Sequence, residues 1–346
     1  MTKGDMYTKK IFRKILKDGC MDKNPRPHYE DYYPNAVYDK DTNTIIDKDN
    51  NVIELNSNQW IVFNKNGVTL CTPAHTLSVN SGVECSYDLS KGESPLITLR
   101  PIACKSSIAE ILWIYQKQSN DLVEFDELLG KNTWEEDHKI NNWWKDWALK
   151  DEKGNYILND QGHPTIGSTY GEVIRKHNLV EKVLKDLKDN PDGRRHIISM
   201  WQDDDFLLPH GLKPCAFMTI WNVRHGRDGK DYLDMTLIQR SSDFATAGCI
   251  NQVQYTVLLM LFARHLNLEP GIFTWKPVNV QIYDRHINQV KELLKRTPAC
   301  DDKDISIDLN TDKTNFYEMT PEDIKVNAPR EKIKKLNPQL KFPLGI

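Results

Sequence analysis

One cysteine of this chain stands between groups that could bind a phosphate. Cys215 directly follows Pro214. Arginines lie on both sides of it in the sequence, at Arg194, Arg195 and Arg240. A cysteine thiolate is a soft nucleophile, and a guanidinium group forks onto phosphate oxygens. These residue types predict a site in which a thiolate attacks a phosphorylated ligand.

Polar side chains near the last of these arginines extend the predicted site. Gln239 and Ser241 flank Arg240, Asp243 follows, and the stretch ends at Asn251. The asparagine amide carries one acceptor and two donors, which suffices to read the edge of an amide-like ring. The whole stretch therefore predicts a site for a phosphorylated pyrimidine.

Two further candidates lie earlier in the chain. Glu110 falls within the apolar part of an expected helix over 105–118. A carboxylate there is either buried for chemistry or simply favoured by the dipole near the helix N-terminus. Arg26 stands between Pro25 and Pro27, which holds it out of a helix. It is either a phosphate ligand or a solvated loop residue.

Aromatic residues form a third group of candidates. Trp144 and Trp147 share one face of an expected helix. Aromatic residues at this spacing usually belong to the core, but clustered tryptophans can also wall a flat heteroaromatic ligand. Tyr170 lies between Gly167 and Gly171 and opens the next expected helix.

Helices and strands interleave along the chain without a strict βαβ repeat. Apolar alternation predicts strands, and apolar residues at helical spacing predict helices. This mixture indicates an α+β (mixed α/β) fold. The expected strands are 68–71, 76–79, 96–99, 195–201, 214–223, 231–238 and 273–283, and the expected helices are 6–20, 105–118, 178–188, 251–266 and 285–296.

No linker, repeat or low-complexity segment divides the chain, which predicts a single domain over 1–346. The stretch 39–66 is polar and rich in Asp and Asn. Within it, 44–46 and 52–55 flank a turn sequence, a pattern typical of a β-hairpin. We expect this stretch to be a surface insertion.

Composition excludes several classes of protein. The 346 residues carry a net charge of −3, unlike a basic protein that coats nucleic acid. No apolar run approaches the roughly 20 residues of a membrane span, and the N-terminus lacks the apolar core of a signal peptide. The seven cysteines form no C-x-x-C pair, so we expect no metal site. Reduced thiols indicate a cytoplasm, bacterial or of a virus-infected host.

Several motifs in a single order resemble the thymidylate synthase family. They cover nearly the whole chain except 39–66 and parts of 120–165. One such motif would be a weak signal, but this many in register are a strong one. The resembling segments are 72–79, 110–113, 141–147, 167–171, 194–199, 214–215, 239–243, 268–271 and 341–346.

The resemblance implies a large twisted mixed sheet flanked by helices, with sheets packing across an obligate homodimer. It implies dUMP as the substrate and 5,10-methylenetetrahydrofolate as the co-substrate, with no metal, membrane or nucleic acid. Cys215 would add to C6 of the uracil, after which C5 takes the one-carbon unit. Glu110 would run proton transfers, and Tyr170 would assist removal of the C5 proton.

The same resemblance assigns the remaining site residues. Arg240 would favour the thiolate and hold the phosphate with Ser241 and Arg26, while Arg194 and Arg195 would reach in from the partner subunit. Asn251 would bind the uracil edge. The other expected substrate contacts are Gln239, Gln281 and Tyr283, and the expected folate contacts are Trp144, Trp147, Asp243 and the carboxylate of Ile346.

Some positions depart from the family pattern. Between Asp243 and Asn251 the family has a glycine and a Pro-Phe pair, and this chain has Ala247 and three other residues there instead. Asn279 is a second departure from the family pattern. Gln281 replaces the histidine that would touch the sugar 3′-hydroxyl, although glutamine can also hydrogen-bond a hydroxyl. Ser168 and Thr169 make the loop before Tyr170 more polar than is usual, which would admit water near C5.

Two alternatives to a thymidylate synthase therefore stay open. A dUMP hydroxymethylase would run the same early steps and then add water, giving 5-hydroxymethyl-dUMP and tetrahydrofolate. A non-catalytic nucleotide or RNA binder would need no thiol, so the presence of Cys215 and Glu110 argues against it. We expect the synthase, which is the commoner activity and yields dTMP and dihydrofolate.

Overall fold

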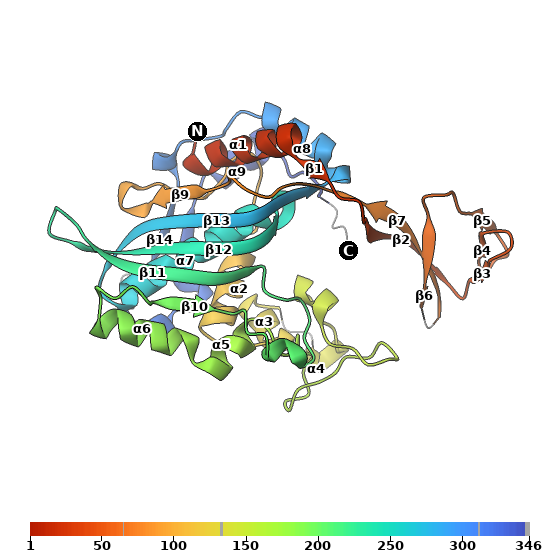
Figure 1. The fold of residues 1–346 in the computed structure, drawn as a ribbon, viewed down its shortest axis with the longest axis horizontal. Helices are drawn as coiled ribbons and strands as arrows, with labels where there is room; N and C mark the ends of the chain where they lie inside the picture. Colours follow the sequence, from red (N-terminus) through yellow and green to blue (C-terminus); the bar gives the residue numbers. More distant parts are fainter. Residues whose placement is uncertain (65, 132–133, 311, 343–346) are drawn as a thin grey trace.

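Among residues 1–64, 66–131, 134–310 and 312–342, which the computed structural model describes, a seven-stranded mixed sheet forms the centre of the molecule (Figure 1). Its two long central strands, β12 and β13, run parallel, and the other pairs are antiparallel. Across the sheet the order is β1 (Cys20–Met21), β8 (Thr76–Val79), β13 (Glu269–Tyr283), β12 (Asp231–Asp243), β11 (Ala216–His225) and β10 (Ile197–Ser199), and β9 (Cys85–Asp88) also pairs with β13.

Helices cover one face of this sheet. α7 (Cys249–His265) lies against β12 and β13, and α2 (Cys104–Tyr115) packs on α7. Trp221 of β11 is fully buried and stacks on Phe262 of α7 with ring centroids 4.8 Å apart. A helix that is apolar nearly all round belongs in the core. The other α-helices are α1 (Lys3–Asp18), α3 (Leu122–Leu128), α4 (Trp134–Asp137), α5 (Gly171–His177), α6 (Leu179–Asp189), α8 (Ile287–Lys295) and α9 (Arg330–Leu336).

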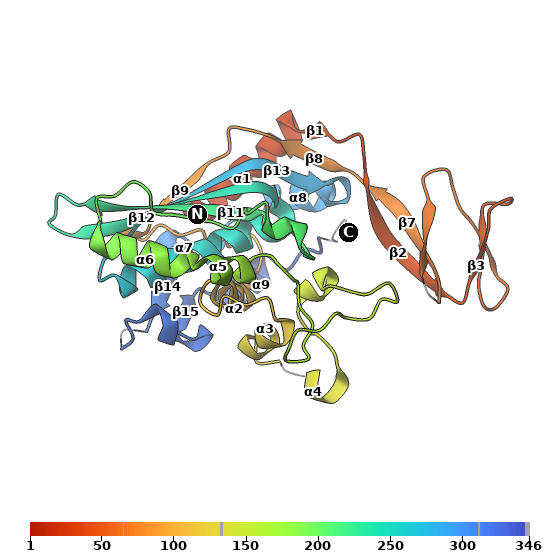
Figure 2. The ribbon, with the colours of Figure 1, turned by 60° about the horizontal axis from the view of Figure 1, so that its bottom comes forward.

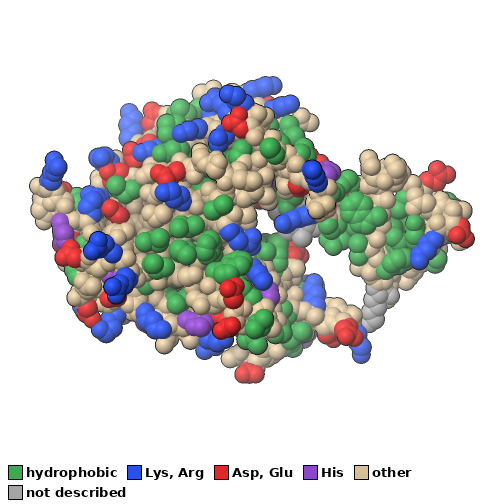
Figure 3. Space-filling view, viewed as in Figure 1, with side chains coloured by type: hydrophobic (Ala, Val, Ile, Leu, Met, Phe, Trp, Pro, Cys, Tyr) green, Lys and Arg blue, Asp and Glu red, His purple; other side chains and the backbone are tan. Residues whose placement is uncertain are grey.

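The opposite face of the sheet carries apolar side chains that the described residues leave open. Side chains alternate between the two faces along a strand. Ile197 is 42% exposed, and Ile220 and Ile238 are half-buried. Hydrophobic side chains gather over this part of the sheet in Figure 3. A contiguous exposed apolar face of this kind marks an interaction surface.

An arm projects from the body (Figures 1 and 2). The chain enters it along β2 (Arg26–Pro34) and returns along β7 (Gly67–Ala74), and these two strands pair antiparallel. β6 (Trp60–Asn64) extends this pair. β3 (Val37–Asp39), β4 (Thr44–Ile46) and β5 (Val52–Glu54) form an antiparallel meander, so the predicted hairpin over 44–55 forms. The arm has a small core of its own, made of Ile45, Leu55, Val68 and Leu70. The excursion from the body is therefore wider than the polar stretch 39–66.

The strand expected over 96–99 does not form, and that prediction is wrong. The segment is buried, but side chains rather than a neighbouring strand satisfy its backbone. Thr2 Oγ1 donates to Leu96 O at 2.9 Å. The Thr98 N–H donates to Asp5 Oδ1 at 2.7 Å. Because backbone groups need partners but not a particular kind of partner, apolar alternation alone did not distinguish this buried loop from a strand.

The other expected elements form within a few residues of their predicted bounds. After α8 the chain adds an antiparallel pair of short strands, β14 (Ser306–Leu309) and β15 (Ile324–Asn327), followed by α9. Within the described residues, no helix combines the length and the apolarity needed to cross a bilayer.

We expect Ile45→Ala to loosen the arm without unfolding the body. Ile45 is fully buried in the arm's core, and such a truncation costs about 2–5 kcal/mol. Because the body has a separate core, amide hydrogen exchange should accelerate in β2 to β7 only. Phe262→Ala, in the body's core, should instead lower the melting temperature of the body. Faster exchange throughout the chain in Ile45→Ala would contradict this separation.

Candidate functional site

The thiol of Cys215 lies at the start of β11, beside the end of β12. The Arg240 N–H of β12 donates to Cys215 O at 2.9 Å, which fixes the two residues across the strand pair. Ser241 Oγ is 3.7 Å from Cys215 Sγ and donates to it. The sheet register therefore brings together the cysteine, the arginine and the serine that the sequence placed some twenty-five residues apart.

The guanidinium of Arg240 is bound by the loop that leads to the cysteine. Its Nε donates to Pro214 O at 2.9 Å, and one terminal nitrogen donates to Lys213 O at 2.8 Å. The other terminal nitrogen donates to Ser241 Oγ at 3.2 Å. The guanidinium also lies 5.8 Å from the centre of the Trp201 ring. A fixed positive charge is thus held next to the sulfur.

Tyr170 approaches the same cysteine from the N-terminus of α5. The Cys215 N–H donates to the tyrosine hydroxyl at 3.2 Å. Burial, and then the neighbouring Cys215 thiol, raise the pKa of Tyr170 well above its ordinary value, so the phenol stays protonated. Tyr170 has φ +47, a strained conformation for a bulky residue. A side chain on the following Gly171 would lie 2.2 Å from Ser119 O, so only glycine fits after this tyrosine.

Glu110 lies on α2, and its carboxyl is buried with 7% of the residue exposed. Trp143 Nε1 donates to Glu110 Oε2 at 2.9 Å. Burial raises the pKa of Glu110 to about 7, while the N–H groups of Trp143, Gln254 and Trp144 partly offset that rise. The carboxyl can therefore either give or take a proton near neutral pH.

Asn251 stands in the first turn of α7 and is oriented by other amides. Its Oδ1 accepts from Gln239 Nε2 at 3.0 Å, and its Nδ2 donates to Gln254 Oε1 at 2.9 Å. Gln239 in turn accepts from Trp275 Nε1 at 2.8 Å. The Oδ1 atom still has one lone pair free to accept from a ligand, and Nδ2 still has one N–H free to donate to it.

Asp243 ends β12 with one satisfied and one open oxygen. Oδ2 accepts from Thr246 Oγ1 at 2.6 Å, whereas Oδ1 is buried and has no partner among the described residues. Burial raises the pKa of Asp243 to about 6. The hydrogen bonds from Thr246, and to a smaller extent the Arg100 charge, oppose that rise. Arg100 is itself buried, donates to Ala245 O at 2.8 Å and lies 5.2 Å from the centre of the Phe342 ring.

The sugar and phosphate candidates lie at the ends of neighbouring strands. Gln281 of β13 is opposite Asp243 of β12, and Tyr283 closes β13. Burial raises the pKa of Tyr283. The charge of Arg26 and its hydrogen bond to the tyrosine lower that pKa and partly offset the rise. The exposed Arg26 at the start of β2 is therefore within reach of Tyr283, and the arm begins next to the candidate site.

Two predicted site residues, Arg194 and Arg195, are not brought to the cysteine of the same chain. Both are exposed and precede β10. In the β10–β11 pair Ile197 is opposite Ile220, so continuing the register puts Arg195 beside Asn222, seven positions after Cys215. At about 3.3 Å per residue this is a separation of roughly 23 Å.

The tryptophan candidates belong to one aromatic cluster. Trp144 is 1% exposed and packs on Trp113 and Tyr170 with ring centroids 5.7 and 4.9 Å apart. Trp147 is half-buried and meets Trp143 edge-on at 5.1 Å. Ile346, the predicted carboxylate contact, lies outside the described residues. Within the described part of the chain, no group of three His, Cys, Asp or Glu side chains is arranged to hold a metal ion.

Known proteins resemble this chain over its full length. A family model described as thymidylate synthase matches residues 61–337. Thymidylate synthases of Streptococcus suis and of Lactococcus lactis subsp. lactis are each 37% identical over 347 residues, with 100% of both chains covered. The solved structure of thermostable thymidylate synthase A from Bacillus subtilis matches with a TM-score of 0.70 and 26% identity, covering 99% of each chain.

The chain belongs to the thymidylate synthase family. The family and the mixed α/β fold with its large flanked sheet, both predicted from the sequence, are confirmed. Enzymes of this family are one-carbon transferases with 5,10-methylenetetrahydrofolate as the co-substrate, so the predicted enzyme class and co-substrate are confirmed with the family. The predicted thymidylate synthase activity is confirmed in the same way, and the hydroxymethylase alternative is not favoured.

Sequence reasoning missed several side chains around the candidate residues, and Trp143 and Arg100 are two of them. Trp143 donates to Glu110, although only Trp144 and Trp147 were singled out of the same tryptophan segment. Arg100 stands in an otherwise apolar stretch, Leu99 to Ile102, and a lone cation in such a stretch was a signal that it is buried for a reason. Neither contact follows from spacing, because each joins separate elements.

Glu110 should make the stability of the protein fall as the pH rises. Burial raises its pKa from 4.5 to about 7, so the native state keeps a proton that the unfolded chain releases. The free energy of unfolding should drop between about pH 4.5 and 7 by at most about 3 kcal/mol from this group. Urea titrations across this range should show a smaller drop for Glu110→Gln. An exposed control, Glu135→Gln, should keep the wild-type slope, and equal slopes in all three proteins would contradict the raised pKa.

Proposed function

We propose that Cys215 is the nucleophile with which this chain attacks dUMP in the thymidylate synthase reaction. The observation that carries the proposal is the convergence of Arg240, Ser241 and Tyr170 on this one residue. The thiolate would add to C6 of the uracil, and the displaced electron pair would make C5 nucleophilic. C5 would take the one-carbon unit from 5,10-methylenetetrahydrofolate, which then supplies a hydride and leaves as dihydrofolate. Expulsion of the thiolate would release dTMP.

Two buried groups of the site, the Glu110 carboxyl and the Tyr170 hydroxyl, are suited to proton transfer. Glu110, with its pKa near 7, suits a group that passes protons to and from the uracil, a role worth about 10²–10⁴ in rate. The protonated Tyr170 hydroxyl suits a position beside C5, where it would orient the acceptor of the C5 proton. Trp143 would hold the Glu110 carboxyl in place.

The uracil and the phosphate would bind at opposite ends of the site. The free lone pair and N–H of Asn251 match the N3–H and O4 of uracil, whereas cytosine would present an unmatched edge. Gln239 would hold that amide in its orientation. Arg240 and Ser241, with Arg26, would bind the phosphate, and Gln281 and Tyr283 would contact the sugar.

The open oxygen of Asp243 suits the folate. A buried acceptor without a partner is costly unless a ligand donates to it, and the pterin ring carries N–H donors. Trp144 and Trp147 would support the wall of that site, and the Ile346 carboxylate would close over it. These residue roles follow the family pattern and the chemistry of the donor set.

We also propose an obligate homodimer in which Arg194 and Arg195 complete the partner's phosphate site. Their distance from Cys215 of the same chain and the open apolar face of the sheet support this arrangement. Closure of that face by a second copy would be a symmetric, isologous interface. The free cysteines support a reducing, cytoplasmic location.

A direct assay tests the activity. Wild type given dUMP and 5,10-methylenetetrahydrofolate should form dTMP with an equal amount of dihydrofolate, followed by its rising absorbance. Cys215→Ser should lower kcat by more than roughly a thousandfold, since the nucleophile is lost. Cys300→Ser, a half-buried cysteine elsewhere, is the matched control and should keep full activity. Formation of 5-hydroxymethyl-dUMP without dihydrofolate would instead establish the hydroxymethylase alternative.

Subunit mixing tests the partner arginines. Cys215→Ser and Arg195→Ala should each be inactive or nearly so as pure dimers. A heterodimer would hold one site with both wild-type residues, so equal mixing after unfolding and refolding should restore about one quarter of the wild-type activity. No recovery, with heterodimers demonstrated by differential tags, would show that Arg195 does not act across the interface.

A further inference from the structure

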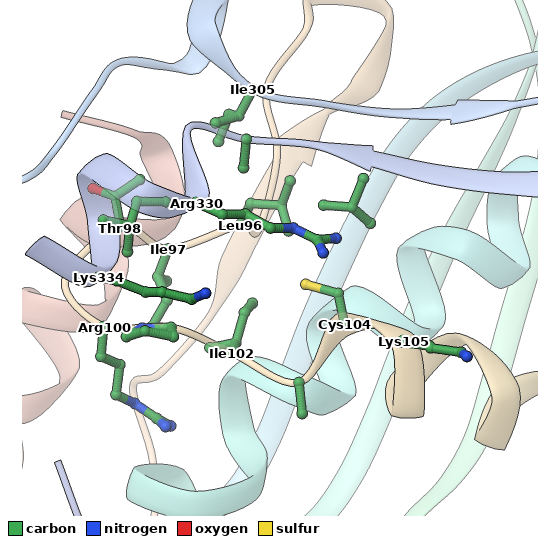
Figure 4. A pocket seen from close by; sticks show the side chains of 15 residues that line it. Leu96, Ile97, Thr98, Arg100, Ile102, Cys104, Lys105, Ile305, Arg330 and Lys334 are labelled. Carbon is green, nitrogen blue, oxygen red and sulfur yellow. The ribbon is translucent and has the colours of Figure 1, made fainter. Parts of the chain in front are cut away.

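A cavity of about 270 Å³ lies behind the segment that carries Arg100, between residues 96–105 and the C-terminal elements β15 and α9 (Figure 4). None of the described residues that line it is a candidate residue of the Cys215 site. Arg100 lines it too, but its guanidinium donates to Ala245 O. Its floor is apolar, with Ile97, Ile102 and Ile305 among the lining residues.

Besides Arg100, three cations are among the residues that line the cavity. Arg330 and Lys334 lie one turn apart on α9, and Lys105 at the start of α2 lies beyond Cys104 and points away from them (Figure 4). The charge of Arg330 acts on the Cys104 thiol in the cavity wall, where it opposes the rise in pKa that burial causes. No aspartate or glutamate is among the described residues that line the cavity.

Glu331, on the same helix, lies beside one of these cations. Lys334 Nζ lies 3.0 Å from Glu331. Both side chains are mostly exposed, at 61% and 88%, and exposed pairs at this spacing contribute little. Because this pair is weak, it leaves Lys334 available to a ligand carboxylate.

We propose that this cavity binds a small aliphatic carboxylate, with its chain on the isoleucine floor and its charged end beside Arg330 and Lys334. When an aliphatic chain binds, the apolar surface of the floor and that of the ligand are both removed from water, which favours binding. The carboxylate matches the guanidinium fork of Arg330. The volume lies just below the usual range for drug-sized ligands, which suits a single short chain rather than a folate.

The binding test uses the full-length protein and ligand-observed NMR titrations of octanoate, hexanoate, butanoate and hexanol. Octanoate should bind saturably. Affinity should improve about fourfold per added methylene, so hexanoate should bind about fifteenfold more tightly than butanoate. Hexanol, which has the chain without the charge, should bind at least tenfold more weakly than hexanoate. No saturable octanoate binding, or equal binding of hexanol and hexanoate, would overturn the proposal.

Matched variants locate the site. The double variant Arg330→Gln/Lys334→Gln should weaken octanoate binding at least tenfold. Lys332→Gln/Lys335→Gln removes the same charge from the same helix at positions that do not line the cavity, and it should bind as the wild type does. Ala328→Trp should block binding by filling the cavity while leaving its cations in place. Thermal melting checks that each variant is folded. If both double variants weakened binding equally, the effect would come from the general surface charge, and the proposed site would be wrong.

A competition separates this proposal from the proposed function. Saturating dUMP with a folate should leave octanoate binding unchanged, and displacement of octanoate would mean that it occupies the folate site instead. Arg330→Gln/Lys334→Gln should keep the basal turnover of dUMP. The cavity proposal can therefore fail while the enzyme assay succeeds, and the reverse.

Discussion

The geometry of the candidate site depends on the binding of Arg240 by the chain around Cys215. The guanidinium meets two carbonyls just before the cysteine and the hydroxyl of Ser241 just after the arginine. These bonds use backbone groups that would otherwise need other partners, and they fix both charge and sulfur before any ligand arrives. Preorganised charge of this kind is usually the largest single contribution to catalysis. The long strands β11 and β12 supply the rigid support.

Two buried carboxyl groups of the site lower the stability of the folded protein. Burial raises the pKa of both Glu110 and Asp243 toward neutrality, and one oxygen of Asp243 is left without a partner among the described residues. Tyr170 adds a strained backbone. Each feature destabilises the free protein, and each is of the kind that persists where function requires it. The well-packed layer of α7 against the sheet offsets these losses.

The sequence predicted what depends on local pattern and on motif order. The apolar stripe of α6, the hairpin at 44–55 and the family itself were all predicted, because periodicity and spacing encode them. The buried loop at 96–99 was not, since its backbone partners come from α1 and from distant side chains. The contacts of Trp143 and Arg100 were missed for the same reason. The positions of Arg194 and Arg195 relative to Cys215 required the strand register.

The most direct test of the central claim is an intact-mass measurement with fluoro-dUMP and 5,10-methylenetetrahydrofolate, followed by peptide mapping. If the sulfur held beside Arg240 is the nucleophile, the protein gains the mass of both ligands, and the modification maps to the peptide that contains Cys215. An adduct on any other cysteine, or no adduct at saturating ligand, would contradict the account.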